Sequence, residues 1–248
     1  MLRITRSIVP NSLTLANLFS GFIAIIYVSQ DKFMLAALFI LLAAIFDLID
    51  GLTARLVQSA SEFGVQLDSL SDVVSFGVVP SFMLYKIYFY QYGDFGLIVS
   101  GLPLICGVLR LARFNVQTNA YQDKMFFTGL AIPSAAFFII SYLIFYHTSD
   151  LLPENVRGFT IFAVTIISSI SMVSTIKFFN APRPNKKYIK QHPFVTVFFL
   201  IAVILAIISK GLSIFPFFVF YIFGSLLRHY FLKYVNKLGI YAKIFSKS

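Results

Sequence analysis

Long apolar segments follow one another along this chain, and they constrain its fold more than any other feature. A helix that crosses the hydrocarbon core of a bilayer needs about 20 mostly apolar residues. Eight segments have roughly this length, at 12–29, 33–56, 67–88, 95–114, 130–147, 158–176, 193–209 and 213–233. The sequence therefore predicts an all-α integral membrane protein with about eight transmembrane helices.

Composition and charge support this interpretation. The chain is 58% hydrophobic and 12% charged, against roughly 45–50% and 25% in soluble domains. Its net charge of +10 does not indicate a nucleic-acid partner, because the basic residues lie beside the apolar segments. Sixteen of the 20 lysines and arginines fall on one side of the expected membrane, and the other side holds Lys32, Lys86, Arg157 and Lys210. Since cytoplasmic loops carry the excess, both termini are expected in the cytoplasm, at the cytoplasmic membrane, where the basic face would attract anionic membrane lipids.

Four aspartates lie inside or at the ends of the second and third apolar segments. A carboxylate at mid-bilayer costs about 2.5 to 3.5 kcal/mol on insertion scales, so their presence needs a reason. Asp47 and Asp50 are three residues apart, and Asp68 and Asp72 are four apart, so each pair shares one face of its helix. A hairpin that turns at the polar connection 58–64 would bring the two faces to one point near the cytoplasmic surface.

Carboxylates this close remain ionised only beside cations. Ligands that are all oxygen suit hard divalent cations, so we expect two Mg²⁺ or Mn²⁺ ions bridged by the aspartates. Gly51 and Ala54 would let a bulky ligand approach the helix backbone, and Arg55 offers a planar set of donors to a phosphate. Taken singly, such small residues are common where membrane helices pack, and an arginine is common at a cytoplasmic helix end.

Eight of these positions also have the spacing of a known signature, and at all eight the chain resembles the CDP-alcohol phosphatidyltransferase family. They are Asp47, Asp50, Gly51, Ala54, Arg55, Gly64, Asp68 and Asp72. The resemblance implies a six-helix core, usually dimeric, in which the first three aspartates and often the fourth hold two divalent metal ions. It also implies that the glycine, alanine and arginine positions receive the CDP moiety and that Asp72 is the catalytic base.

Four further stretches resemble one branch of that family, the bacterial and archaeal enzymes that make phosphatidylserine from CDP-diacylglycerol and L-serine, with release of CMP. The stretches are 10–17, 68–77, 110–115 and 129–133. The first of them adds Asn11 and Thr14 to the expected CDP-lipid site. Arg110 and Arg113, with Asn115, form a candidate serine site, because guanidinium groups bind carboxylates. The same two arginines would also be expected if they serve only to orient the helix end.

The resemblance covers about residues 8–180. We therefore expect a catalytic core of six spans at 1–180, followed at 181–248 by a loop, two additional spans and a basic cytosolic tail. Three alternatives stay open. A sister transferase would keep the same core but use glycerol 3-phosphate or an inositol phosphate. A cation or proton transporter also carries acids in its spans, spread along a pathway rather than gathered at one end. A metal-binding scaffold without turnover would not need all four aspartates.

Overall fold

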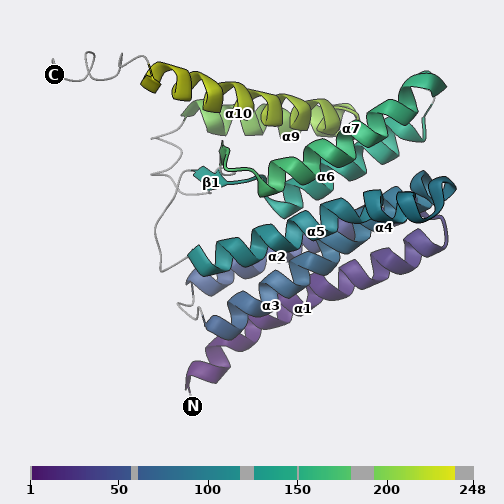
Figure 1. Cartoon of the computed structure of the whole chain (residues 1–248). Coiled ribbons are helices and arrows are strands. Elements are labelled where there is room, and N and C mark those ends of the chain that lie inside the picture. The colour runs from purple at the N-terminus through teal and green to yellow at the C-terminus, as the bar shows by residue number, and fades with distance from the viewer. Residues whose placement is uncertain (1, 57–60, 118–125, 150, 180–192, 238–248) are drawn as a thin grey trace. The chain divides into compact units, whose positions relative to one another are not determined.

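A computed structural model describes the chain except for residues 1, 57–60, 118–125, 150, 180–192 and 238–248. Helices make up nearly all of the described structure (Figure 1). The chain divides into two compact units. One unit comprises residues 1–119 and 131–173, and the other comprises residues 120–130 and 174–248.

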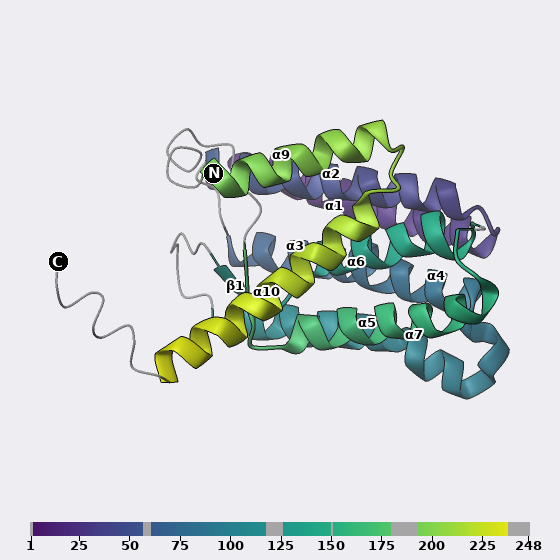
Figure 2. The same cartoon turned by 90° about the horizontal axis from the view of Figure 1, so that it is seen from above.

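The first unit is a bundle of helices that run alongside one another (Figures 1 and 2). Its helices are α1 (Leu2–Ser29), α2 (Phe33–Leu56), α3 (Glu62–Asp72), α4 (Val79–Ile87), α5 (Gly93–Gln117), α6 (Ile132–Tyr142) and α7 (Glu154–Val173). A π-helical segment, Val73–Val78, joins α3 to α4 without a break, and a second one, Leu143–His147, extends α6. A 3₁₀ turn, Phe89–Tyr92, precedes α5.

The second unit contains a small sheet and two helices. Strand β1 (Phe126–Thr128) pairs antiparallel with β2 (Lys177–Phe179), and the helices are α9 (Pro193–Ile208) and α10 (Ile214–Lys237). Figure 2 shows the two helices diverging from the turn that joins them. The Arg228 guanidinium of α10 donates to the Lys177 carbonyl at 2.6 Å. This bond attaches α10 to the sheet. The sheet is not predictable from the sequence, because strands of three residues are too short to show an alternation of apolar and polar residues.

The expected transmembrane architecture is confirmed in its main features. Six helices of the described chain are long and apolar enough to cross a bilayer, at Ile8–Ser29, Phe33–Ala54, Glu62–Ile87, Phe89–Val116, Glu154–Val173 and Ile214–Val235. The two other expected spans correspond to shorter helices, Ile132–His147 and the 16-residue α9. The chain is therefore a helical, multi-pass membrane protein, and six of its helices reach full spanning length within the residues that the structure describes.

Two boundaries differ from the sequence prediction, and both bear on the site. Helix α1 continues through Pro10 instead of starting after it. Helix α3 begins at Glu62, because the Ser61 side chain accepts a hydrogen bond of 3.0 Å from the Gly64 amide and so caps the first turn. Gly64 consequently lies inside a helix and not in the connecting segment.

Helices α1 and α2 pack closely because small and branched side chains line their contact. Ala24 and Val28 of α1 and Ala36, Ile40 and Ala43 of α2 are fully buried. Small residues let the backbones of membrane helices approach each other. This contact holds α2, with its pair of aspartates, against α1.

Candidate metal centre and substrate pocket

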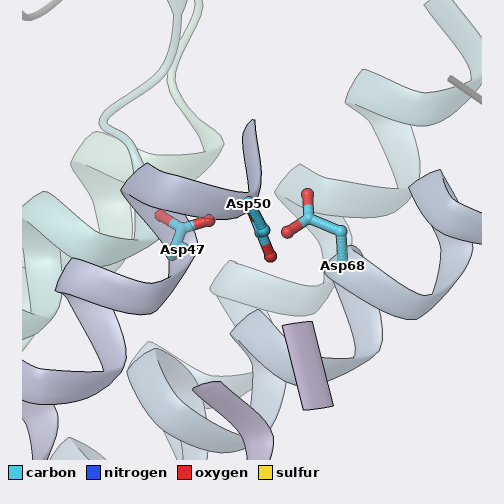
Figure 3. Close-up of side chains that lie close together, drawn as sticks. All are labelled: Asp47, Asp50 and Asp68. Carbon is cyan, nitrogen blue, oxygen red and sulfur yellow. The ribbon is translucent and has the colours of Figure 1, made fainter. Parts of the chain in front are cut away.

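Three aspartates converge at one end of the helix bundle. Asp47 and Asp50 extend from α2 and Asp68 from α3, and one carboxylate oxygen of each lies within 4.8 Å of the others. Figure 3 shows Asp50 between the other two, whose carboxylates face it from opposite sides. Asp50 is buried, and Asp47 and Asp68 are half-buried. The spacing within α2 and the position of α3 beside it thus produce a compact set of oxygen ligands.

This set of oxygens fits a hard divalent cation. The Asp68 Oδ1 atom is buried and has no hydrogen-bond partner among the described residues. A buried polar atom without a partner is unfavourable, and a bound cation would satisfy it. Carboxylate oxygens are the ligands that Mg²⁺ and Mn²⁺ prefer. The triad can therefore hold a metal ion.

Helix α1 supplies a hydroxyl that orients the central aspartate. The Thr14 Oγ1 atom lies 2.7 Å from Asp50 Oδ2 and 3.0 Å from the Pro10 carbonyl, and Thr14 is buried. A hydroxyl has one proton to donate, so it serves one of these acceptors at a time. The sequence motif indicates only lipid binding for Thr14, so its contact with Asp50 is a finding of the structure.

Asp72 lies one turn of helix beyond Asp68 and is not part of the triad. Its side chain is buried, and the Asn17 Nδ2 group of α1 lies 3.4 Å from its Oδ1 atom. Asn17 is the last residue of the stretch 10–17, and the family resemblance indicates no role for it. A signal was available, because Asn17 is an amide in an apolar span, three residues after Thr14 and so on the same helix face.

A pocket opens beside the aspartates, and most of the expected CDP-lipid residues line it. Its empty volume is about 470 Å³, and its walls are formed by Pro10, Asn11, Thr14, Asp50, Gly51, Ala54, Ser61, Gly64, Val65 and Asp68. A Cβ atom on Gly64 would lie 3.2 Å from Ser61 Oγ and 3.4 Å from Asn11 Oδ1, so the glycine keeps this wall open. The Arg55 side chain lies outside the described side chains.

The three candidate serine-site residues lie toward the end of α5 and differ in their contacts. Arg110 is buried, with its guanidinium carbon 6.0 Å from the centre of the Phe114 ring. Arg113 donates a hydrogen bond of 2.9 Å to the carbonyl of Val173, the last residue of α7, where a positive charge stabilises the helix end.

Asn115 links α5 to the helix that carries Asp68 and Asp72. Its Nδ2 group donates to Ser69 Oγ at 2.9 Å. Asn115 thus contacts α3, which carries Asp68 and Asp72, whereas Arg113 donates to the end of α7.

Comparison with known proteins agrees with this geometry. The family model for CDP-alcohol phosphatidyltransferase matches residues 7–176. The chain is 33% identical over 210 residues to a CDP-diacylglycerol--serine O-phosphatidyltransferase of Helicobacter pylori, covering 83% of this chain and 85% of the relative. It is 33% identical over 170 residues to the enzyme of that name from Bacillus subtilis, covering 68% and 89%.

An archaeal relative is similar to this chain to a comparable degree. The chain is 35% identical over 171 residues to an archaetidylserine synthase of Methanothermobacter thermautotrophicus, covering 68% of each chain. The matched region contains all four aspartates and the pocket beside them. The chain therefore belongs to the CDP-alcohol phosphatidyltransferase family.

Proposed function

We propose that this enzyme transfers the phosphatidyl group of CDP-diacylglycerol to the hydroxyl of L-serine, forming phosphatidylserine and CMP. The observation that carries the proposal is the convergence of Asp47, Asp50 and Asp68 at a pocket walled by small residues. The choice of serine is supported by the names of the relatives, two of which specify transfer to serine and one the synthesis of archaetidylserine.

The pocket suits the polar part of a CDP-lipid, and the acyl chains would remain in the bilayer between the helices. Gly51 and Ala54 present little side chain, so a nucleotide can approach the α2 backbone. Asn11 and Thr14 supply polar groups from α1, opposite Gly64. Arg55, one residue after Ala54, would donate to the pyrophosphate oxygens.

The aspartates would hold the metal ions that the reaction requires. Asp47, Asp50 and Asp68, with Asp72 as a fourth ligand, suit two Mg²⁺ or Mn²⁺ ions. Such ions, when bound, stabilise the negative charge that develops on the transferring phosphoryl oxygens and on the leaving group. Thr14 keeps Asp50 oriented for this task by its hydrogen bond to Oδ2.

Asp72 is the proposed general base. Its carboxylate accepts the proton of the serine hydroxyl, and the hydroxyl oxygen forms a bond to the phosphorus that carries diacylglycerol. The bond from that phosphorus to the CMP oxygen breaks, so the transfer is direct and needs no covalent enzyme intermediate. General-base assistance of this kind contributes about 10²- to 10⁴-fold to a rate.

The end of α5 would bind the serine carboxylate. Arg110 lies buried in the bundle, and Arg113 lies one helical turn further along α5, where its guanidinium donates to the Val173 carbonyl. Asn115 holds this helix end against α3 through Ser69, close in sequence to Asp68 and Asp72. A carboxylate bound here would bring the serine hydroxyl toward the base.

The positive charge around the aspartate-bearing helix ends supports a site on the cytoplasmic face of the cell membrane. We assign catalysis to residues 1–180 of a homodimer, and we regard residues 181–248 as an addition to that core.

The acceptor assay tests the proposal. The purified enzyme is supplied with CDP-diacylglycerol, Mn²⁺ or Mg²⁺, and either L-serine, glycerol 3-phosphate or an inositol phosphate, and CMP release is measured. Of the three acceptors, we expect only L-serine to cause CMP release. Release only with a phosphorylated alcohol would refute the serine assignment and leave the family assignment intact.

A further inference from the structure

We propose that Asn17 is a positioning residue, which holds the Asp72 carboxylate in the orientation needed for proton transfer. The inference rests on the proposed role of Asp72 as base. Asn17 is fully buried in α1, and its Nδ2 group lies 3.4 Å from Asp72 Oδ1. This distance exceeds the usual value of about 2.9–3.0 Å.

A second contact, one turn away, fixes Asn17 relative to the segment that carries Asp72. Ser75 Oγ donates to the Asn17 carbonyl at 3.1 Å. Gly21 makes this approach possible, because a Cβ atom there would overlap Ser75 Oγ and lie 2.9 Å from Ser75 Cα. The contacts of Asn17 with Asp72 and with Ser75 together fix the position of α1 along its axis, and its rotation about that axis, relative to the segment that carries these two residues.

The backbone around Ser75 is also unusual. The π-helical segment Val73–Val78 begins directly after Asp72. Such segments are rare and occur frequently at functional sites, since the wider turn changes the direction of the side chains. Here Ser75 is the residue of that segment that bonds to α1. The irregularity therefore contributes to the contact between α1 and the base.

The chemistry of Asn17 favours a role beyond packing. The Asn17 Oδ1 atom is buried and has no hydrogen-bond partner among the described residues. An apolar side chain of similar size would fill this space in a membrane helix without an unsatisfied polar atom. Donation from Nδ2 to Asp72 Oδ1 fixes the orientation of the carboxylate that accepts the proton of the acceptor alcohol. The amide thus has a reason to be there that packing alone does not provide.

The test compares Asn17→Leu with wild type in full-length, detergent-purified enzyme. Steady-state CMP release gives kcat and the KM for CDP-diacylglycerol and for serine, and thermal unfolding reports on the fold. We expect kcat to fall about 10- to 100-fold, the range for loss of one hydrogen bond to a charged group, while the KM for CDP-diacylglycerol and the melting temperature stay near wild type.

Three further variants make the result decisive. Ser20→Ala is the matched control, because Ser20 is a buried polar residue of α1 whose hydroxyl donates within its own helix, to the Ala16 carbonyl at 2.7 Å. Its kcat should be unchanged. Asn17→Ala should lose as much kcat as Asn17→Leu, and it decides the question if the leucine variant does not fold. Asp72→Asn, measured in parallel, tests the base itself.

The possible outcomes separate the two hypotheses. A wild-type kcat in a folded Asn17 variant, with Asp72→Asn inactive, would overturn the positioning role and leave the proposed reaction standing. Activity in Asp72→Asn would instead remove the base assignment on which the inference rests. A loss confined to the melting temperature would show that Asn17 serves only the fold.

Discussion

Replacing Thr14 with valine should weaken metal binding more than it slows the chemical step. Valine has the shape of threonine but no hydroxyl, so Asp50 Oδ2 loses its donor at 2.7 Å in a buried environment. A hydrogen bond to a charged group contributes roughly 1.5 to 3 kcal/mol, and loss of a residue that orients a metal ligand typically reduces metal affinity or activity about 10- to 100-fold. We therefore expect the Mn²⁺ concentration for half-maximal activity to rise about tenfold or more, with a smaller change in kcat at saturating metal.

The assay is CMP release at saturating CDP-diacylglycerol and serine across a Mn²⁺ titration. Thr53→Val is the matched control, since Thr53 Oγ1 donates to backbone carbonyls of its own helix, with Ile49 at 2.6 Å and Asp50 at 3.0 Å. It removes the same hydroxyl from α2 without touching a carboxylate. If Thr14→Val and Thr53→Val had the same metal dependence as wild type, the idea that α1 orients Asp50 would be wrong.

Four other substitutions test separate parts of the account. Asp72→Asn should reduce kcat by at least about 10²-fold while binding of CDP-diacylglycerol survives in an equilibrium assay; near-normal turnover would exclude it as the base. Arg110→Ala and Arg113→Ala should each raise the KM for serine more than the KM for CDP-diacylglycerol, and an unchanged KM for serine in both variants would contradict the acceptor site. Arg113→Ala should also lower the thermal stability, because it removes the hydrogen bond to α7. Gly21→Ala should destabilise the protein by about 1 to 3 kcal/mol, since the added methyl meets Ser75, and an unchanged melting temperature would show that the helices separate there without penalty.

The transmembrane helices and the aspartate site were predictable because local pattern determines them. Apolar length alone located α2 at its observed bounds, Phe33–Leu56. The spacing of Asp47 and Asp50 placed both on one helix face, and a short connection to α3 brought Asp68 to them. The acids gather at one end of the bundle, as a transferase requires and as a transport pathway does not.

What escaped prediction depends on how helices are rotated against one another. No sequence pattern states that Asn17 faces Asp72 or that Ser75 reaches the α1 backbone. The π-helical turn after Asp72 shifts the register of later side chains, and it has no clear signature in the sequence. Similarly, the pairing of Phe126–Thr128 with Lys177–Phe179 joins segments far apart in the chain.

Mn²⁺ binding to the purified protein, followed by electron paramagnetic resonance of the free ion, tests the central claim most directly. We expect wild-type enzyme to deplete the free Mn²⁺ signal, Asp50→Asn and Asp68→Asn to lose most of this binding, and Asp94→Asn to retain it, because Asp94 lies exposed in the first turn of α5 and outside the triad. Equal Mn²⁺ binding by wild type, Asp50→Asn and Asp68→Asn, or no binding by wild type, would contradict a metal centre shared by α2 and α3.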